Sequence, residues 1–319
     1  MSVKALERHL LPLQPYLQMD GVTEICINQP GEVYVENQGK FTGYFVEELD
    51  INFLQMLAVL VAEYNHKDYP TPLLSGTLPT GERIQFVLHP ACEKRKLVCA
   101  IRRQQMRDMK LEDYRENGTF AEVEQPSASN ANEQLKQLYF DQDWYSFIKH
   151  AIHAKKNILI SGGTGTGKTT FLNACLKCIP AHERLITVED TREVMVNHPN
   201  TAHLLFNEED KRITALNIFK VCLRLRPDRI FLSELRGAEV WPYLRAANSG
   251  HPGSLSTVHA DTAEAAFTQL VFMMQQAGST SSEEQLRNYI KSIVPIVVQL
   301  KRDANPDKFM HVSEVYFKG

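Results

Sequence analysis

The segment Ser161-Gly-Gly-Thr-Gly-Thr-Gly-Lys-Thr-Thr170 decides how the rest of the chain is interpreted. From Gly162 to Thr169 its spacing is G-x-x-x-x-G-K-T, which is that of a phosphate-binding loop. The apolar run at 157–160 predicts a strand before the loop, and 171–177 predicts a helix after it. A glycine-rich turn without function would not need this context. The segment therefore predicts a nucleoside triphosphate site.

Each residue type in the loop has a physical reason to be there. The glycines let the backbone turn its N–H groups inward, and the following helix adds positive partial charge. Lys168 is expected to reach the β- and γ-phosphates, and the Thr169 hydroxyl to ligate Mg²⁺. The predicted nucleotide-binding residues of the loop are Gly162, Gly163, Thr164, Gly165, Thr166, Gly167, Lys168, Thr169 and Thr170.

Three later segments each predict a strand that ends in polar residues. They are ITVEDTREV with Glu189, RPDRIFLSELRG with Glu234, and GHPGSLSTVHA with His259. In an open parallel sheet, ligands lie at the carboxyl ends of the strands, so the three segments are expected to converge near Lys168. A magnesium triphosphate needs an acid for the metal and a group that orients the attacking water.

Glu234, Glu189, His259 and Lys168 are accordingly the predicted catalytic residues. Glu234 ends an apolar strand in a Walker B pattern, so we expect it to bind the metal together with Thr169 and to position water. Glu189 is expected to be a polarising partner, although spacing does not separate the roles of the two glutamates. His259 is expected to contact the terminal phosphate.

Arginines complete the set of candidates. Arg224 and Arg226 precede the Walker B strand, Arg236 follows it, and Arg83 and Arg102 lie far upstream. A guanidinium on the terminal phosphate raises hydrolysis roughly 10³- to 10⁵-fold and is often supplied by another domain or subunit. The alternative for each arginine is a surface or structural charge.

Composition limits the classes of protein. The chain has 319 residues, of which 43% are hydrophobic and 23% charged, as expected for a soluble protein of two domains. A net charge of −3 gives no sign of nucleic-acid binding. The N-terminus lacks an apolar signal core, and the apolar stretch 53–61 is too short to span a bilayer. We therefore expect a cytoplasmic protein.

The pattern along the chain predicts two domains. Residues 1–106 alternate with period two in several short runs, which predicts a smaller α+β domain: an antiparallel sheet with helices on one face. Residues 107–143 are rich in acids and polar residues and predict a linker. Residues 144–319 predict an α/β domain with a mostly parallel sheet. Its expected strands are 157–161, 184–189, 229–234, 254–259, 296–301 and 311–317.

Two further features leave alternatives open. A linker of this length allows the N-terminal domain to lie on its own C-terminal domain or on that of a neighbouring chain. The pair Cys175-x-x-Cys178 has the spacing of a metal site but no second pair, and core packing explains it equally well.

With these motifs in place, the chain resembles the secretion ATPases that drive type II secretion, type IV pili and type IV secretion. The phosphate loop and the three later segments resemble the Walker A motif, Asp box, Walker B motif and His box of that superfamily, in the same order. Within it, GVTEICINQPGEVYVENQGKF, SGTLPTGERIQFVLHP and the later VCAIRR resemble the traffic ATPases of type IV secretion, the eleventh VirB component.

The resemblance implies a RecA-like ATPase domain that uses ATP and Mg²⁺, and a homohexameric ring with nucleotide between the two domains. It places the ring on the cytoplasmic face of the inner membrane, peripherally associated, with other secretion components as partners and no nucleic acid needed for turnover. It also implies that Arg83 and Arg102 reach the phosphates from the N-terminal domain. Asp261 departs from the Asn often found after the His box, and the absence of a four-cysteine zinc module argues against the type II branch.

The main hypothesis is an ATP-driven motor for substrate translocation and pilus assembly. Pilus assembly or retraction ATPases and tight-adherence pilus ATPases share the same motifs and remain alternatives. A nucleotide-gated docking platform, in which hydrolysis is incidental, is a second class. A nucleic-acid motor of the RecA kind is a third, which the net charge of −3 disfavours.

Overall fold

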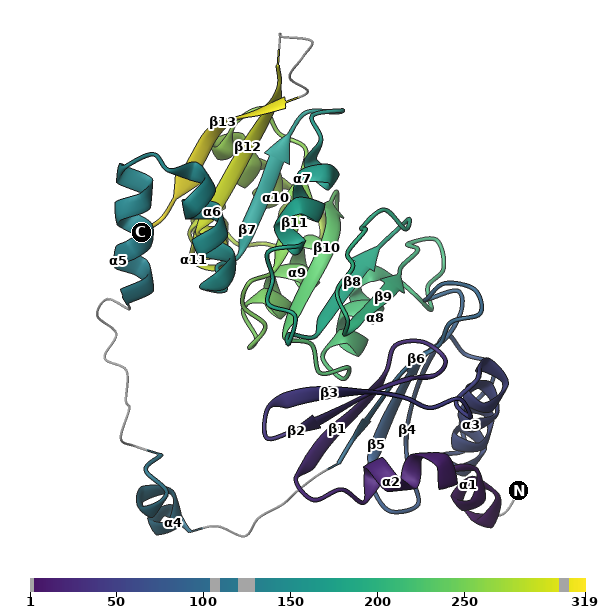
Figure 1. The fold of residues 1–319 in the computed structure, drawn as a ribbon. Helices are drawn as coiled ribbons and strands as arrows, with labels where there is room; N and C mark the ends of the chain where they lie inside the picture. Colours follow the sequence, from purple (N-terminus) through teal and green to yellow (C-terminus); the bar gives the residue numbers. More distant parts are fainter. Residues whose placement is uncertain (1–2, 104–109, 120–129, 304–309) are drawn as a thin grey trace.

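A computed structural model describes residues 3–103, 110–119, 130–303 and 310–319, and it folds into two units with one sheet each (Figure 1). The N-terminal sheet has the order β3-β2-β1-β6-β5-β4, and its neighbouring strands are all antiparallel. Its elements are α1 (Val3–His9), η1 (Leu11–Leu13), α2 (Gln14–Leu17), β1 (Val22–Ile27), β2 (Glu32–Asn37), β3 (Lys40–Phe45), α3 (Ile51–Tyr64), β4 (Leu73–Thr77), β5 (Arg83–Val87) and β6 (Val98–Arg102).

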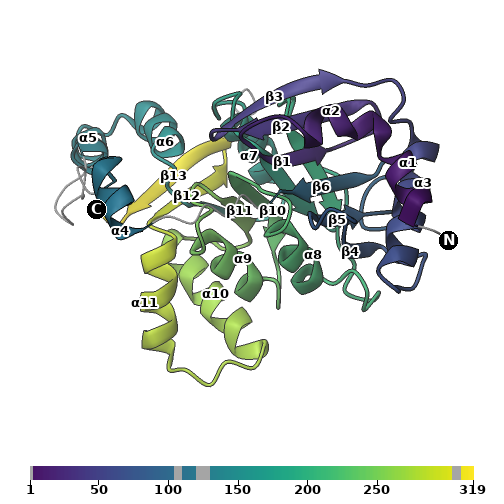
Figure 2. The same cartoon turned by 90° about the horizontal axis from the view of Figure 1, so that it is seen from below.

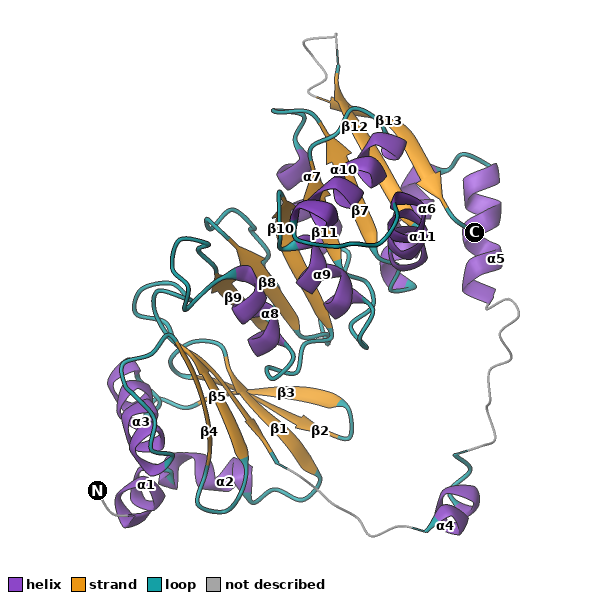
Figure 3. Cartoon of the chain, turned by 180° about the vertical axis from the view of Figure 1, so that it is seen from behind, coloured by secondary structure: helices purple, strands orange, loops and turns teal. Residues whose placement is uncertain are grey.

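The two faces of the N-terminal sheet bury different partners. On β1, Ile25 and Ile27 pack with the apolar residues of α1, α2 and α3, and Figure 3 shows these helices on the side away from the second unit. Cys26 lies between them in sequence and faces the opposite way, because side chains alternate along a strand. Cys26 packs into the core of the second unit with Leu225. The sheet is therefore covered by helices on one face and by the C-terminal unit on the other.

The C-terminal sheet has the order β13-β12-β7-β11-β10-β8-β9, and its pairs are parallel except β12 with β13. This is the mostly parallel α/β architecture expected for the C-terminal part of the chain. The elements after β6 are α4 (Leu111–Glu116), α5 (Asn130–Phe140), α6 (Trp144–His153), β7 (Ile158–Gly162), α7 (Lys168–Leu176), β8 (Leu185–Glu189), β9 (Thr201–Leu205), α8 (Ala215–Cys222), β10 (Arg229–Leu235), α9 (Val240–Ala247), β11 (Leu255–Val258), α10 (Ala263–Gln276), α11 (Glu283–Ile293), β12 (Ile296–Arg302) and β13 (Met310–Phe317).

Helices cover both faces of this sheet, as Figure 2 shows. On one face, Phe231 of β10 packs with α6 and α7. On the other, the adjacent residues Ile230 and Leu232 pack with α8, α9, α10 and α11. The sequence Ser282-Glu283-Glu284-Gln285 has the spacing of a capping box, and helix α11 begins there, with Ser282 accepting from the backbone N–H of Gln285. No helix in the described ranges is both long and apolar enough to span a lipid bilayer.

Several elements differ from the sequence expectation. Strand β9, of sequence TAHLL, was not expected, but it pairs in parallel with β8 at the sheet edge. Helix α4 lies within the expected linker 107–143. The expected linker 107–143 contains α5, whose Leu135 is fully buried and whose Tyr139 packs on Phe147. In the structure α5 thus packs as part of the C-terminal unit. The expected polar tract includes residues 120–129, which lie outside the described residues.

The N-terminal unit docks mainly at the amino ends of the C-terminal strands. Arg184, which is fully buried just before β8, donates to Asn28 Oδ1 over 2.7 Å and to the carbonyl oxygen of Leu225 over 2.8 Å. Arg226, just before β10, forms an ion pair with Glu36 of β2. Separating such buried charges from their partners is costly, so these contacts stabilise the arrangement of the two units seen in this structure.

Candidate functional site

The phosphate loop has a backbone that only glycine tolerates at several positions. Gly165 and Gly167 have φ values of 71° and 80°, in the left-handed region. A Cβ on Gly162 would lie 2.5 Å from Thr166 Oγ1 and 2.8 Å from the carbonyl oxygen of Leu300. Gly167 is the N-cap of α7, so the N-terminus of that helix opens into the loop. The arrangement supplies inward N–H groups and a positive helix end, which together suit a phosphate group.

Lys168 is the cation of this loop. Its side chain is buried, and Nζ lies 3.0 Å and 3.1 Å from the carbonyl oxygens of Gly162 and Gly163. Burial lowers the pKa of Lys168, and the nearby negative charge of Glu234 opposes that effect. In the described parts of the chain, no carboxylate oxygen forms a hydrogen bond with Nζ. A buried ammonium held only by neutral acceptors fits a site that receives an anion.

Polar side chains from three strand ends extend from Lys168 in a continuous series. His259 Nδ1 is 3.2 Å from Lys168 Nζ, and His259 Nε2 is 2.6 Å from Glu234 Oε1. Arg236 Nε donates to Glu234 Oε2 over 2.6 Å, and Arg236 Nη1 pairs with Asp190 Oδ2 at 2.8 Å. We call these five residues the strand-tip network. An ammonium only donates, so His259 accepts from Lys168, and its Nε2 lies close to Glu234 Oε1.

The strand-tip network explains why motifs so far apart in sequence act at one place. Strands β7, β11, β10 and β8 are consecutive neighbours in the sheet, so their carboxyl ends meet at one edge. The structure brings the predicted residues Glu234 and His259 to Lys168 at that edge. A cavity of about 480 Å³ opens beside Glu234 and Arg236.

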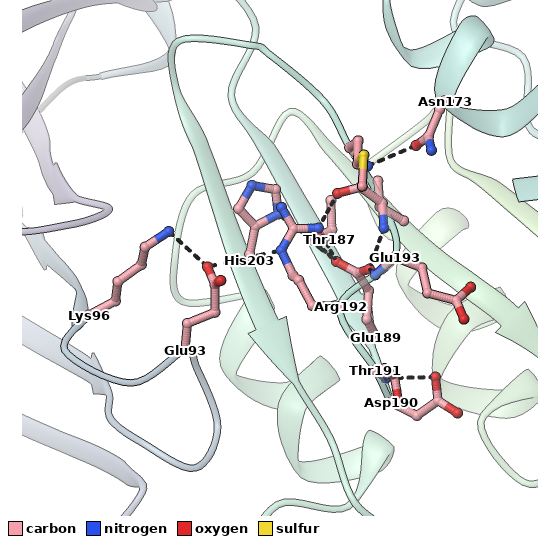
Figure 4. A network of polar contacts seen from close by, with 12 residues as sticks. Glu93, Lys96, Asn173, Thr187, Glu189, Asp190, Thr191, Arg192, Glu193 and His203 are labelled. Atoms are coloured by element: carbon pink, nitrogen blue, oxygen red, sulfur yellow. Dashed lines mark hydrogen bonds and ion pairs between the residues drawn. The ribbon is translucent and has the colours of Figure 1, made fainter. Parts of the chain in front are cut away.

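Glu189 lies elsewhere, in contrast to its expected role as a polarising partner. Its carboxylate is fully buried and accepts hydrogen bonds from Thr187 Oγ1, Arg192 and the backbone N–H groups of Glu193 and Val194 (Figure 4). Within the described residues, no hydrogen bond or ion pair connects it with Lys168 or Glu234. The next residue, Asp190, takes part in the strand-tip network instead. Asp190 directly follows Glu189 in the segment ITVEDTREV, but the expected role was given to Glu189.

The candidate arginines separate into three environments. Arg236 is in the strand-tip network, whereas Arg226 pairs with Glu36 and Asp228 between the two units. Arg224 donates to Ser75 Oγ over 2.8 Å and lines a cavity of about 310 Å³. That cavity is also lined by Lys67, Arg83 and Arg102.

This basic cavity is far from the phosphate loop of the same chain. Arg224 precedes β10 and Glu234 lies near its other end, and seven strand residues span roughly 20 Å. Arg102 is held by an ion pair with Glu24 at 2.8 Å. Arg83 is exposed, and its guanidinium has no hydrogen bond with any described residue. The structure therefore does not bring Arg83 and Arg102 to Lys168.

The expected Mg²⁺ is compatible with the donor set at this edge. The carboxylate of Glu234 and the hydroxyl of Thr169 are hard oxygen ligands of the kind that Mg²⁺ prefers. Arg236 donates to Glu234 Oε2, and His259 Nε2 lies 2.6 Å from Oε1, so binding the ion or its waters requires that this carboxylate change its neighbours. Elsewhere in the described ranges, no group of three or more His, Cys, Asp or Glu residues forms a metal site.

The motif Cys175-x-x-Cys178 has a packing role in the structure. Cys175 is buried in the core between α6, α7 and the sheet, and Cys178 packs against the same core. Burial raises the pKa of the Cys175 thiol to about 12, which keeps it protonated and unreactive at neutral pH.

Comparisons with known proteins agree with the motifs. The model of the family described as Type II/IV secretion system protein matches residues 103–314. The Type IV secretion system protein VirB11 of Brucella suis is 36% identical over 97% of this chain and 89% of its own length. The chain belongs to the type II/IV secretion system protein family.

A second relative and a solved structure are similar to this chain over nearly its whole length. The Type IV secretion system protein PtlH of Bordetella pertussis is 33% identical over 98% of this chain and 95% of its own. The crystal structure of the Brucella suis VirB11 ATPase in complex with sulphate superposes with a TM-score of 0.92, at 35% identity and 98% coverage of both chains. The expected type IV secretion ATPase and its two-part RecA-like fold are thereby confirmed, and the chain is an ATP-hydrolysing enzyme.

Proposed function

We propose that this secretion-family ATPase is a homohexameric motor that powers translocation of substrates and assembly of a pilus in a type IV secretion system. The observation that carries the proposal is the contact series from Lys168 through His259 to Glu234 at one edge of the sheet. A phosphate-binding cation and a carboxylate that positions metal or water are parts of a triphosphate-hydrolysis site, and here the His259 imidazole lies between them.

In this proposal ATP lies on the phosphate loop with Mg²⁺. The backbone N–H groups of residues 162–170 surround the phosphates, and Lys168 contacts the β- and γ-phosphates. Mg²⁺, when bound, neutralises charge that develops on the phosphates. Thr169 and Glu234 hold the ion or its waters, and Glu234 also positions the attacking water. His259 lies between Lys168 and Glu234. In this position it contacts the terminal phosphate and couples its binding to the position of the Glu234 carboxylate.

The proposed ring supplies a second set of cations. Arg83 and Arg102 line a basic cavity at the opposite end of β10 from Glu234, so they are positioned for another chain's nucleotide rather than their own. Head-to-tail contacts around a closed ring place such a surface of one chain against the phosphate loop of the next. We propose that the arginines act across this subunit boundary, on the cytoplasmic face of the inner membrane, where other secretion components bind the ring.

The assembly state tests this proposal most directly. Native mass spectrometry of the full chain with ATP and Mg²⁺ is expected to show six copies, since each nucleotide site needs a neighbour to be complete. The control is the same sample without nucleotide. A single copy under all conditions, with full turnover at high dilution, would contradict the ring.

The role of Arg83 is tested by mixing two inactive variants. Arg83→Ala leaves the phosphate loop intact and is expected to lower kcat about 10²- to 10³-fold, because the transferred phosphoryl group loses a guanidinium. Lys168→Ala retains Arg83 but lacks the cation of the loop. If arginines act across subunits, mixing the two chains restores part of the turnover, since some boundaries then combine both intact halves.

The matched control for this experiment is Lys40→Ala, which removes an exposed cation from the same N-terminal domain. We expect it to turn over ATP at the normal rate. Turnover that stays at the level of the separate variants after mixing and subunit exchange contradicts supply of Arg83 by the neighbour.

A further inference from the structure

The loop after β8, residues 190–195, is held by hydrogen bonds to the buried carboxylate of Glu189. Glu189 Oε2 accepts from the backbone N–H groups of Glu193 and Val194, both over 2.7 Å. Glu189 Oε1 accepts from Thr187 Oγ1 over 2.8 Å and from Arg192 Nη1 over 3.0 Å. Four donors on one carboxylate hold this loop, which we call the β8 loop, in a single path.

Arg192 is the cation that compensates Glu189. The carboxylate is fully buried, so a charged partner is needed to offset its desolvation. His203 lies 4.0 Å from Glu189 Oε1, but burial, together with the charge of Arg192, lowers the pKa of His203 to about 3. His203 is therefore neutral at physiological pH, and the compensating charge comes from Arg192.

Arg192 also reaches the N-terminal domain. Its Nε lies 4.0 Å from Oε2 of Glu93, which is in the segment between β5 and β6 (Figure 4). Lys96 donates to the same carboxylate over 2.7 Å. Close by, the backbone N–H of Leu205 at the end of β9 donates to the carbonyl oxygen of Ala91 over 2.8 Å. The N-terminal domain thus touches the carboxyl edge of the C-terminal sheet at this place.

The β8 loop has two further contacts, and both lead to the nucleotide site. Asp190 at its start pairs with Arg236, which holds Glu234. Near its end, the backbone N–H of Met195 donates to Asn173 Oδ1 over 3.0 Å, and Asn173 lies on α7, the helix that follows the phosphate loop. One short loop therefore contacts the N-terminal domain, the strand-tip network and the phosphate-loop helix.

We propose that Arg192 is a positioning residue. Its contact with Glu93 makes the rate of ATP hydrolysis depend on the position of the N-terminal domain. When Glu93 lies beside Arg192, the β8 loop holds Asp190 in its ion pair with Arg236. Arg236 in turn holds Glu234 in the orientation that suits water and metal. When the N-terminal domain moves away, the guanidinium loses its second carboxylate and the loop gains freedom. The inference rests on the proposed role of Glu234 in hydrolysis, and it adds a named contact that couples domain movement to that role.

Glu93→Gln tests the coupling without changing the hydrogen bonds that Glu189 accepts. The substitution preserves shape and removes the charge that faces Arg192. Because a partly exposed ion pair contributes modestly, we expect kcat to fall about 3- to 5-fold. KM for ATP should stay within about twofold, since the phosphate loop is unchanged. Steady-state ATPase assays on the full chain, with thermal unfolding to verify the fold, give both values.

Two controls separate coupling from local damage. Lys96→Gln removes the other cation bound to Glu93 and leaves the Arg192 contact, so its kcat should remain normal. Glu47→Gln removes an exposed charge elsewhere on the N-terminal domain and should also have no effect. A normal kcat in Glu93→Gln, or an equal loss in Lys96→Gln, overturns the inference.

A double-mutant cycle assigns the effect to the pair. Arg192→Lys keeps a charge near Glu189 but lacks the planar fork that reaches two carboxylates at once, and a loss of kcat about 3- to 5-fold is expected. If both residues act through one contact, the double variant is no slower than either single variant. Additive losses overturn the inference. Absence of ATPase activity in the unaltered chain would instead overturn the proposed function itself.

Discussion

Lys168→Ala is expected to lower ATP turnover about 10³-fold or more, because the transferred phosphoryl group loses its one buried cation from the phosphate loop. Nζ of Lys168 lies against the carbonyl oxygens of Gly162 and Gly163, at the mouth of the loop. The other cation of the strand-tip network, the guanidinium of Arg236, is engaged with Glu234 and Asp190. Alanine leaves the loop backbone free to bind phosphate weakly, so KM should rise as kcat falls.

The fold should survive this substitution. Burial lowers the pKa of Lys168, which means that the folded state disfavours the charged amine relative to the unfolded chain. Removing the amine therefore removes an unfavourable desolvation, and the thermal midpoint should be unchanged or slightly higher. Lys177→Ala, at the exposed C-cap of the same helix, is the matched control and should retain full activity. Turnover by Lys168→Ala above about a tenth of normal would place the nucleotide elsewhere in the chain.

Sequence predicted those parts of the fold whose signals are local. The phosphate loop, the apolar strands that end at Glu234 and His259, and the capping box at Ser282 each lie within about ten residues, and all have the expected local structure. Their meeting at one edge follows from a parallel sheet, in which the carboxyl ends of all strands point the same way. Local pattern and sheet topology were sufficient there.

Local sequence pattern does not decide which of Glu189 and Asp190 reaches the nucleotide site. Glu189 is the last residue of β8 and Asp190 is the first residue after it, and of the two only Asp190 pairs with a residue of the strand-tip network. Glu189 shares its side with Thr187 and turns into the β8 loop, whereas Asp190 reaches Arg236. Spacing alone does not reveal which side faces the ligand, because that depends on the neighbouring strands.

The positions of the arginines and the structure of the linker could not be predicted from local pattern, because both depend on contacts between residues far apart in sequence. Placing Arg83 relative to Lys168 requires knowing how the N-terminal sheet docks, and that is decided by pairs such as Arg184 with Asn28, 156 positions apart. Helix α5 was hidden by its polar composition, although Leu135 and Tyr139, four residues apart, form an apolar stripe that packs on the C-terminal core. Strand β9 likewise takes its place from pairing with β8 rather than from its own pattern.

Glu234→Gln should separate nucleotide binding from hydrolysis. The amide is nearly the same shape as the carboxylate but carries no charge, so it ligates Mg²⁺ weakly and is a poor orienter of water. We expect kcat to fall about 10²- to 10³-fold. Affinity for ATP should be retained or increased, since Lys168 and the loop remain and a negative charge near the phosphates is removed. Single-turnover hydrolysis and equilibrium binding of ATP measure the two effects independently.

Two comparison variants sharpen this result. Glu284→Gln, on the exposed first turn of α11, removes the same charge far from the site and should behave as the unaltered chain. Asp190→Asn removes the outer end of the strand-tip network and should cost less than Glu234→Gln, because it acts on Glu234 through Arg236. Equal kcat in Glu234→Gln and the unaltered chain would remove Glu234 from the chemistry.

The same variant also distinguishes a motor from a platform. A Glu234→Gln chain that binds ATP and forms the ring keeps everything a nucleotide-gated docking platform requires, while a motor also needs repeated turnover to move between states. We therefore expect cells carrying this variant as the sole copy to export no substrate and assemble no pilus. Export at the normal level from a ring that binds ATP without hydrolysing it would show that nucleotide binding alone organises the partners.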